Sequence, residues 1–529
     1  MKRIFTYDST LRDGEQCEGI TLSLEDKLRI VERLDAFGVD VIEGGFPASN
    51  PKDIAFFERV RSMSLRHARI AAFGSTCKKG VAAADDQGLA DLIGSGAPVV
   101  TIVGKTWDEQ VTRALQTTLD ENLRMIADSV AYLKAQGLTV VFDAEHFFDG
   151  YKANADYALT CVRAASEAGA DSIDLCETNG GALPHEVAEI VAAVAAALPE
   201  QQLGIHCHND SGCAVANTLA AVRAGATQVQ GTVNGFGERV GNTDLLTVIA
   251  DLELKMDCVT VGPDNLRELT SVSQFVAETC NMSVPAHHPY TGASAFAHKG
   301  GLHASAIARF PEAYEHARPE SVGNTQRMLV SELAGKASLI AKAKGLGIDL
   351  TQYPDKTQSI LDDIKRREAA GYSYETADGS LALLLQRHLG AYRPHFTLES
   401  FRVIVDDHED TGALAKDAMS EATIKIHVGD QRFVATGEGA GPVGALDNAL
   451  RMAIEAFYPQ VADIELVDYK VRILDENVGT DAITRVVITT RDKCGSWGTV
   501  GVSENIIEAS WNALVDSIEY GLMRWTPSS

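Results

Sequence analysis

Short apolar runs rich in β-branched residues alternate with longer segments of helical periodicity from the N-terminus to about residue 255. The alternation occurs eight times, which predicts eight strands, each followed by a helix. The predicted strands are Arg3–Tyr7, Val39–Glu43, Arg69–Phe73, Pro98–Val103, Leu138–Asp143, Ser172–Cys176, Leu203–His208 and Gln228–Val233. Strands that alternate with helices pair in parallel, and about 250 residues is the usual size of a closed barrel. We therefore predict an α/β fold, a (β/α)8 TIM barrel over residues 1–262, with an open doubly wound sheet as the alternative.

Local signals set the ends of the first predicted helix. Ser23 and Asp26 have the spacing of a capping box, which satisfies free amide groups at a helix N-terminus. Apolar residues then recur at helical spacing, at Leu24, Leu28, Val31 and Leu34. Gly38 follows, and glycine commonly ends a helix because it adopts the left-handed conformation without strain. The helix is therefore expected to end at Gly38.

The strand pattern fades after about Pro263. Residues 263–390 have the pattern of helices joined by polar loops, which predicts a linker or accessory subdomain. Strands return beyond Pro394 in two halves that resemble each other, and each half ends in a helix. This internal repeat predicts a C-terminal α+β regulatory domain over residues 391–529. We expect a duplicated βαβ-type module that buries its sheet by pairing, with a pocket between the copies.

Length, charge and cysteine content exclude several classes of protein. A chain of 529 residues exceeds one hydrophobic core, so two or three domains are expected. The net charge of −26 repels nucleic acid and anionic lipid, and no block of Lys or Arg offsets it. The longest apolar run, residues 190–199, is shorter than the roughly 18 residues of a membrane span. We expect a cytoplasmic protein without a signal peptide, whose nine cysteines, free of any C-x-x-C pair, stay reduced.

The segment GIHCHND contains the strongest candidate chemistry. His206 and His208 are two residues apart on a predicted strand, so their side chains point to the same face and Cys207 points to the other. The C-terminal ends of barrel strands face the mouth, where active sites of this architecture lie. The pair alone has two interpretations, which are metal ligands or histidines that are solvated or held by structural hydrogen bonds.

Polar residues also gather at the ends of other predicted strands. They are Arg12, Asp13 and Gln16 after the first, Glu43 at the second, Asp143 and Glu145 at the fifth, Glu177 and Thr178 at the sixth, and Asn242 after the eighth. Charged groups aimed at one mouth are costly unless they pair with each other or bind a ligand. A ring of ion pairs at the rim is the alternative. One carboxylate, two imidazoles and an amide oxygen nearby instead form a donor set for Zn²⁺, Mn²⁺ or Mg²⁺, with positions open for water and substrate.

A second histidine cluster follows the barrel in FAHKGGLHASAIAR, with His298 and His303, and Tyr314 lies beyond it. Gly300 and Gly301 predict a turn before a helix that begins near His303. An exposed histidine without a function is the alternative. The glycine-rich segment GEGAGPVG lacks the Lys-Ser/Thr ending of a P-loop and the spacing of a dinucleotide fingerprint, so we expect a turn before a helix there.

These motifs resemble the DRE-TIM metallolyase family, whose Asp, Arg and Glu match Asp13, Arg12 and Glu43. DSTLRDGEQ, IEGGFP, ETNGG, HCHND and NGFGERVGNTDL occur in the family's order. Past the barrel, HKGGLHASA, VGNTQRMLVSELAGKASL and the duplicated module resemble the acetyl-CoA-dependent branch, which contains 2-isopropylmalate, citramalate and homocitrate synthases. Within that branch the chain is most similar to the citramalate synthases, over nearly its whole length.

The resemblance implies an acyltransferase that condenses acetyl-CoA with a 2-oxo acid, which is pyruvate in a citramalate synthase of isoleucine biosynthesis. It implies that Arg12 binds the oxygen that gains charge, that Thr178 binds the substrate carboxylate, and that Glu145 with His303 transfers protons. The implied metal ligands are Asp13, His206, His208 and Asn242. Tyr314 is a further catalytic candidate, and the remaining substrate-binding candidates are Gln16, Glu43 and Asp143.

The resemblance also implies regulation and assembly. The C-terminal domain is expected to bind an amino-acid effector, isoleucine or leucine. The family places the helices after the barrel over a neighbour's active site, which implies a homodimer.

Asp143 departs from the resemblance, because citramalate synthases carry an aromatic residue there. A carboxylate does not cradle a methyl group unless it turns aside to a basic neighbour, so synthesis of 2-isopropylmalate or homocitrate from another oxo acid is the alternative. A 3-hydroxy-acyl-CoA lyase is disfavoured, because that branch uses a Cys in the loop before the final Asn, lacks the duplicated domain, and NGFGERVGN has no Cys. A regulator without catalysis is disfavoured by the intact Arg12, Asp13, His206 and His208.

Overall fold

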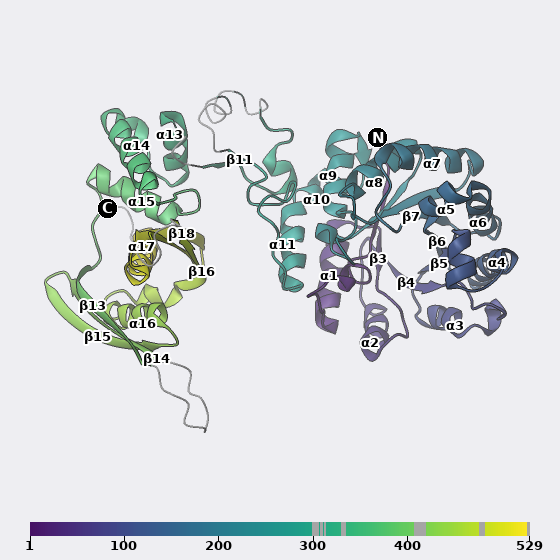
Figure 1. Ribbon diagram of the computed structural model, residues 1–529, viewed down its shortest axis with the longest axis horizontal. Helices are drawn as coiled ribbons and strands as arrows, with labels where there is room; N and C mark the ends of the chain where they lie inside the picture. Colours follow the sequence, from purple (N-terminus) through teal and green to yellow (C-terminus); the bar gives the residue numbers. More distant parts are fainter. Residues whose placement is uncertain are drawn as a thin grey trace, which may run out of the picture. The chain divides into compact units, whose positions relative to one another are not determined.

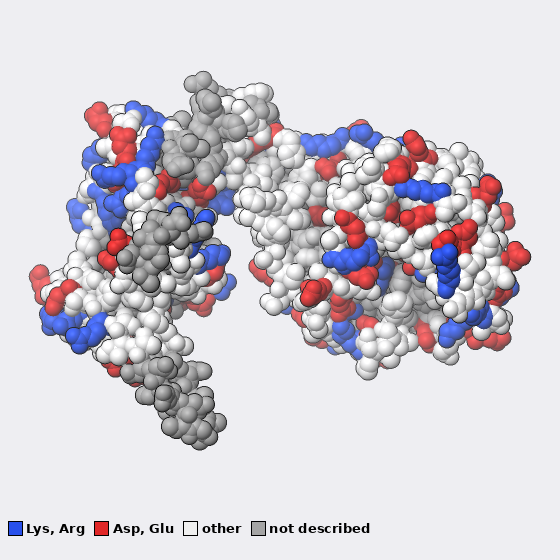
Figure 2. Space-filling view, in the orientation of Figure 1, with Lys and Arg blue, Asp and Glu red and all other residues white. Residues whose placement is uncertain are grey.

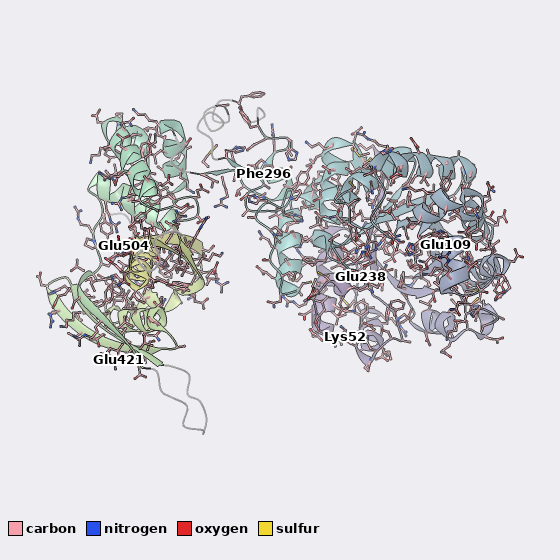
Figure 3. All side chains as sticks on the ribbon, viewed as in Figure 1. Lys52, Glu109, Glu238, Phe296, Glu421 and Glu504 are labelled. Atoms are coloured by element: carbon pink, nitrogen blue, oxygen red, sulfur yellow. The ribbon has the colours of Figure 1, made fainter. Side chains whose placement is uncertain are left out.

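A computed structural model describes residues 1–298, 306, 310, 314–329, 335–406, 419–474 and 482–525. The chain divides into two compact units. The first contains Met1–Phe296 and His316–Gln326, and the second contains Ala297–Glu315 and Arg327–Ser529. Phe296, labelled in Figure 3, ends the first continuous segment of the first unit. Each unit has a hydrophobic core of its own.

Eight parallel strands close into a barrel in the first unit (Figure 1). They are β2 (Phe5–Asp8), β3 (Val41–Glu43), β4 (Arg69–Ser75), β5 (Val99–Lys105), β6 (Thr139–Glu145), β7 (Ser172–Glu177), β8 (Gln202–Cys207) and β9 (Gln228–Gly231). The TIM barrel is thus confirmed, and the pairing of β2 with β9 excludes the open sheet. Two strands begin two residues later than predicted, because Lys2–Arg3 form a separate strand β1 and β3 pairs only from Val41.

Helices cover the outside of the barrel (Figure 1). They are α1 (Leu24–Phe37), α2 (Pro51–Val60), α3 (Gln87–Gly94), α4 (Leu119–Ala135), α5 (Phe147–Ala153), α6 (Ala155–Glu167), α7 (Pro184–Ala197), α8 (Ala214–Ala224) and α9 (Leu245–Lys255). The loops add 3-10 helices η1 (Gly14–Gln16), η2 (Ala83–Asp85) and η4 (Val233–Gly235) and the π-helix η3 (Gln110–Ala114). Apolar helix faces and outward-pointing strand residues form one large core, in which Leu34, Ile102 and Val191 are fully buried.

The first helix has the predicted ends. Ser23 Oγ accepts a hydrogen bond from the Asp26 amide, and the Asp26 carboxylate accepts one from the Ser23 amide, which completes the capping box. Gly38 ends the helix with φ of 95°. Beyond the barrel the first unit adds β10 (Cys258–Val259), α10 (Pro263–Leu266), α11 (Leu269–Thr279) and η6 (Pro319–Val322). Strand β10 pairs with β1, and α11 packs against α1, which places the start of the predicted accessory region in the barrel unit.

The second unit combines helices with two antiparallel sheets. The described helices before its sheets are α13 (Lys336–Gly345), η7 (Leu350–Gln352), α14 (Pro354–Ala369) and α15 (Asp378–Leu389). One sheet is β13 (Thr397–Asp406), β14 (Met419–Val428) and β15 (Gln431–Gly439), and the other is β16 (Glu465–Ile473), β17 (Thr484–Asp492) and β18 (Gly495–Ser503). The first sheet is followed by α16 (Pro442–Ile454) and η8 (Pro459–Asp463), and the second by α17 (Ile506–Trp525). Short strands β11 (Ala297–His298) and β12 (Arg327–Met328) pair with each other.

The predicted internal repeat is confirmed, with one correction. Each copy is three antiparallel strands followed by a helix, and not a βαβ unit, because the neighbouring strands pair antiparallel and a βαβ unit pairs its strands in parallel. The two copies share one hydrophobic core, which contains Ile424 and Leu450 of the first copy and Ile488 and Leu514 of the second. The copies therefore bury their sheets by pairing, as expected.

Surface features bear on the partners that the chain can take. Figure 2 shows acidic and basic side chains interspersed over the visible face of the barrel unit. Among the described residues, no helix is long and apolar enough to cross a membrane. All nine cysteines are free thiols.

Candidate functional site

Asp13, His206 and His208 come together at the C-terminal ends of β2 and β8. Asp13 lies in a tight turn after β2, in which Ser9 O accepts a hydrogen bond from the Arg12 amide at 3.1 Å. His206 is on β8 and His208 directly follows that strand. Ligand atoms of the three buried side chains lie within 4.8 Å of one another. His206 Nε2 is 3.6 Å from Asp13 Oδ2 and 3.4 Å from His208 Nε2.

Asn242 joins this cluster from the loop after β9. Its side-chain amide donates to Asp13 Oδ1 at 3.1 Å, and its backbone forms a bridge with His208. Gly237 of the same loop has φ of +156°, and a Cβ built there would overlap the Asn242 amide. The glycine is therefore needed for the loop to close around Asn242. Helix α9 begins only at Leu245, so Asn242 lies in the loop before that helix.

Burial and charge set the protonation state of the cluster. Burial raises the pKa of Asp13, but Arg12 and the two histidines outweigh it and lower the pKa to about 2. Burial, together with the neighbouring His208, lowers the pKa of His206 to about 3. Burial also lowers the pKa of His208. At neutral pH the cluster is therefore one carboxylate and two neutral imidazoles, the forms in which these side chains bind metal.

Two buried atoms of the cluster, His208 Nδ1 and Asn242 Oδ1, have no hydrogen-bond partner within the described part of the chain. A buried polar atom without a partner costs free energy unless a ligand or water pairs with it. A carboxylate, two imidazoles and an amide oxygen form a donor set for divalent ions that leaves positions open. The side chains of the cluster therefore fit a divalent metal ion.

Arg12 extends from the end of β2 toward β3 and β4. Its Nε is 2.6 Å from Glu43 Oε2, and its NH1 is 2.7 Å from Asp13 Oδ2. Its guanidinium carbon lies 4.0 Å from the ring centroid of Phe73 on β4. The Tyr7 hydroxyl donates to the other Glu43 oxygen at 2.7 Å. These contacts hold the positive charge of Arg12 directly beside the cluster.

Gln230 on β9 contacts His206 and was not predicted as a site residue. Its Oε1 is 3.1 Å from His206 Nδ1, and its Nε2 donates to Asp143 Oδ1 at 3.0 Å and to Asp174 Oδ2 at 2.7 Å. Because both carboxyl groups accept from this amide, its nitrogen faces them and its oxygen faces the imidazole. His206 Nδ1 therefore carries the proton, and the lone pair of Nε2 points toward Asp13 and His208.

Asp143 is buried in the barrel interior. Burial, followed by the nearby charges of Asp174 and Glu43, raises the pKa of its carboxyl well above the usual value. Among the described residues, its hydrogen-bond partner is the neutral amide of Gln230 and not a basic side chain. Gln228 donates to Asp174 at 2.7 Å. Polar residues at alternate positions of β9, in QVQ, were the signal in the sequence for this interior network.

The other predicted site residues of the barrel lie at its C-terminal end. Glu145 is the last residue of β6 and forms an ion pair with Lys105, the last residue of β5. Thr178 follows β7, and its hydroxyl accepts a hydrogen bond from the His146 amide at 2.9 Å. Gln16 is exposed at the end of η1. Their roles stay predictions.

The candidates after the barrel are not placed in this site. His303 lies outside the described residues. Tyr314 belongs to the second unit, and 48% of its surface is exposed. His298 is in β11, with its Nε2 3.4 Å from Glu315 Oε1. A catalytic part for His303 or Tyr314 therefore stays a prediction.

Known families match successive parts of the chain. Residues 3–276 match the HMGL-like family, and residues 290–371 match the homocitrate synthase post-HMGL domain-like family. Residues 375–522 match the LeuA allosteric (dimerisation) domain. The barrel with its buried cluster lies within the first match, and the internal repeat lies within the last.

Curated relatives match over nearly the full length. An (R)-citramalate synthase of Streptomyces coelicolor is 53% identical over 520 residues, which cover 98% of this chain and 96% of the relative. An (R)-citramalate synthase of Aquifex aeolicus is 49% identical, and one of Geobacter sulfurreducens is 51% identical, each over 523 residues that cover 99% of this chain and 98% of the relative. The chain therefore belongs to the HMGL-like family and carries the LeuA allosteric (dimerisation) domain.

Proposed function

We propose that this chain is an acyltransferase that condenses acetyl-CoA with pyruvate and water to give (R)-citramalate and CoA. The observation that carries the proposal is identity of about half of all residues, over nearly the whole chain, to relatives named (R)-citramalate synthase. The barrel supports the chemistry, because it holds a buried carboxylate and two imidazoles beside an arginine at its mouth.

We propose that the metal ligands are Asp13, His206, His208 and the amide oxygen of Asn242. When a divalent ion such as Mg²⁺, Mn²⁺ or Zn²⁺ is bound, it supplies Lewis-acid polarisation of a carbonyl group. The low pKa values of the aspartate and histidines keep these ligands free of competing protons.

Arg12 is the residue proposed to stabilise negative charge on the keto oxygen of the oxo acid. Both Glu43 oxygens are already engaged, one by Tyr7 and the other by Arg12. We therefore assign Glu43 to holding the guanidinium in position, where it needs no rearrangement as charge develops. Gln16, exposed beside this turn, is proposed to contact the bound substrate.

Proton removal from the acetyl methyl group needs a positioned base, because a thioester is a weak carbon acid. Glu145, with His303 and Tyr314, is proposed for the proton transfers, and Thr178 for the substrate carboxylate. The new carbon–carbon bond joins the acetyl methyl carbon to the keto carbon of pyruvate. Hydrolysis of the resulting thioester then releases CoA.

In the sequence, a carboxylate at position 143 argued against pyruvate as the substrate. The surroundings of Asp143 weaken that argument. Its carboxyl accepts a hydrogen bond from Gln230, and burial raises its pKa, which makes a charged carboxylate less favourable at this position. We therefore still propose Asp143 as a residue that lines the binding site of the oxo acid.

Regulation and assembly are proposed from the C-terminal match. The LeuA allosteric (dimerisation) domain supports an amino-acid effector, for which we propose isoleucine, with leucine as the alternative. It also supports a homodimer. The predicted domain boundaries near residues 262 and 390 remain proposals, and we further propose a cytoplasmic location.

The test is thiol release from acetyl-CoA with pyruvate, 2-oxobutyrate, 2-oxoisovalerate and 2-oxoglutarate in turn, with added Mg²⁺ or Mn²⁺. We expect the highest kcat/KM with pyruvate, and (R)-citramalate as the product on a chiral column. Faster turnover of 2-oxoisovalerate or 2-oxoglutarate would contradict the proposal. His208→Ala should lose both metal and thiol release, whereas Cys207→Ala, on the opposite face of β8, should keep both.

A further inference from the structure

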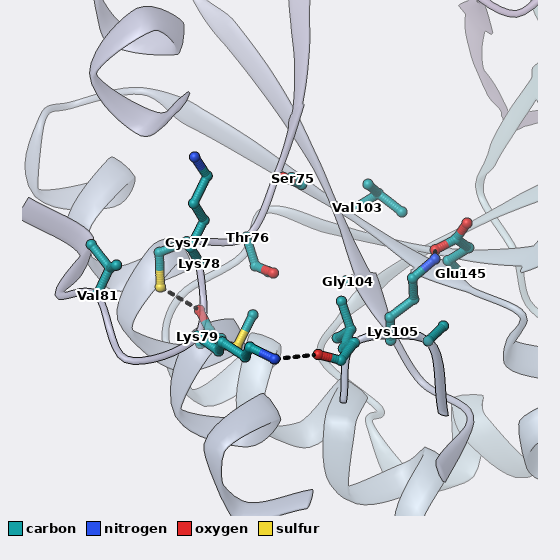
Figure 4. A pocket seen from close by; sticks show the side chains of 13 residues that line it. Ser75, Thr76, Cys77, Lys78, Lys79, Val81, Val103, Gly104, Lys105 and Glu145 are labelled. Carbon is teal, nitrogen blue, oxygen red and sulfur yellow. Dashed lines mark hydrogen bonds and ion pairs between the residues drawn. The ribbon is translucent and has the colours of Figure 1, made fainter. Parts of the chain in front are cut away.

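A cavity of about 640 Å³ opens at the C-terminal ends of β4, β5 and β6 (Figure 4). Part of its wall is apolar, with Val81, Val103, Leu115 and Met125. The rest includes three lysines, Lys78 and Lys79 after β4 and Lys105 at the end of β5. An apolar slot with several cations suits a ligand that is both apolar and strongly anionic.

Two of these lysines carry a positive charge that no carboxylate neutralises within the described part of the chain. Lys105 pairs with Glu145. Lys79 Nζ donates only to the backbone carbonyls of Leu115 and Gln116, both at 3.0 Å. The ammonium of Lys78, which is exposed, has no hydrogen bond or ion pair to any described residue. In a chain of net charge −26, such unpaired cations beside a cavity mark where an anion can bind.

One side of the cavity is built from unusual backbone. Ala114 ends the π-helix η3 (Gln110–Ala114), and Gln116 has a positive φ of 53°. π-helical turns and left-handed non-glycine residues cost free energy and occur often at functional sites. The Lys79 hydrogen bonds tie this segment to the loop after β4, so the cavity wall is held in one shape.

The cavity shares the barrel mouth with the buried cluster. The cluster comes from β2, β8 and the loop after β9, and the cavity comes from β4, β5 and β6, which lie farther around the closed ring. Glu145 lines the cavity, and Figure 4 shows Lys105 extending to it. A long ligand can therefore lie in the cavity and present one end to Glu145.

We propose that this cavity binds the phosphate and pantetheine portions of the acyl-CoA co-substrate. Lys78 and Lys79 contact phosphate oxygens, the apolar wall packs against the pantetheine arm, and the thioester is directed to Glu145. The inference rests on the proposed function, because it takes acetyl-CoA as the co-substrate. Lysine binds phosphate as a mobile point charge on a flexible stem, so the two side chains need not converge before the ligand arrives.

The experiment compares the unchanged full-length protein with Lys78→Ala and with Lys78→Ala/Lys79→Ala. Each variant should raise KM for acetyl-CoA, by about tenfold or more for the double variant, with KM for the oxo acid and metal content unchanged. Lys78→Ala is the cleaner variant, because it leaves the Lys79 bonds to the wall intact. Arg163→Ala/Arg223→Ala removes two exposed cations from α6 and α8 and controls for net charge.

A thioester without phosphates separates phosphate binding from damage to the site. With S-acetyl-N-acetylcysteamine, the double variant and the unchanged protein should have the same kcat/KM. An equal loss with both thioesters, or an unchanged KM for acetyl-CoA, would overturn the inference. Calorimetric titration with CoA alone needs no turnover. CoA binding that depends on these lysines, in a protein without thiol release, would count against the proposed function and not against the cavity.

Discussion

Gln230 determines, at the scale of single residues, how His206 can act. Its amide nitrogen is committed to Asp143 and Asp174, so its oxygen must accept from His206 Nδ1. The partners behind metal-binding histidines fix the tautomer and the orientation of the ring. The hydrogen bonds of this uncharged amide therefore orient the His206 ring so that its Nε2 can act as a metal ligand.

Gln230→Leu should lower the affinity for a divalent ion by about 10- to 100-fold, because His206 loses the acceptor that orients it. The measurement is calorimetric titration of the metal-free protein with Mn²⁺. Gln228→Leu is the matched control, since Gln228 on the same strand contacts Asp174. Equal losses in both variants would mean that the effect comes from the interior network in general and not from His206.

Asp8 at the end of β2 links stability to pH. Burial raises the pKa of its carboxyl to about 7, although Thr10 donates two hydrogen bonds to it. Because this value exceeds the unfolded value near 4, the unfolded chain loses its proton first as the pH rises. Stability from this group is full below about pH 4 and is lost as the pH rises toward 7.

Asp8→Asn should therefore stabilise the first unit, by up to about 4 kcal/mol at pH 8 and by less at pH 5. Thermal unfolding at both pH values measures the difference. Asp35→Asn is the control of opposite sign, because amides of residues 66–68 outweigh the effect of burial and lower the pKa of Asp35. That variant should be less stable than the unchanged protein at both pH values, and a shift of both variants in one direction would refute the explanation.

At the scale of elements, the two repeats of the second unit use glycine in the same way. Gly437 on β15 and Gly501 on β18 each lie under the helix of their own repeat, where a Cβ would overlap the backbone of Ala449 or Ala509. Each helix therefore packs directly on its sheet. The matching positions strengthen the interpretation of the two halves as copies of one module.

Gly501→Ala should destabilise the second unit by about 1–3 kcal/mol, because the added methyl group forces α17 away from β18. Thermal unfolding of the full-length protein measures this loss. Gly444→Ala lies within α16, where an added Cβ would meet no described atom within 4 Å beyond its chain neighbours and the backbone of its own helix, and should instead stabilise by about 0.5–1 kcal/mol. Similar effects of both substitutions would contradict direct packing at Gly501.

At the scale of the whole molecule, the regulatory domain cannot be tested by a simple cut at residue 390. Leu381, Leu384 and Leu385 of α15 share a buried cluster with Val500 of β18. Removal of the repeats would expose this face, and the truncated chain would aggregate for reasons unrelated to regulation. The full-length protein is therefore the material for the effector test.

We expect isoleucine to lower the rate of thiol release in the full-length protein, because the LeuA allosteric (dimerisation) domain supports an amino-acid effector. Light scattering should give twice the chain mass of 56.7 kDa, with and without the effector. Leucine is the comparison ligand, and lysine is the control. A rate unaffected by isoleucine and leucine would end the regulatory proposal, and an active monomer would end the dimer proposal.

The sequence alone determined the architecture and most of the candidate site. Alternation of strands and helices predicted the barrel, because burial requires apolar residues at the period of each element. The H-x-H pair predicted that His206 and His208 share a face, because side chains alternate along a strand. Local signals also predicted both ends of the first helix, which Ser23 caps and Gly38 ends.

Only the tertiary structure decided which distant residues meet. The register of β6, β7 and β9 places Asp143, Asp174 and Gln230 in one network behind His206. The pairing of β4 with β5 brings the lysines at the ends of these two strands to one cavity. Register depends on hydrogen bonds between strands far apart in the chain, and a shift of one residue would turn each side chain to the opposite face. No local pattern records that choice, because it is made by the packing of the whole barrel.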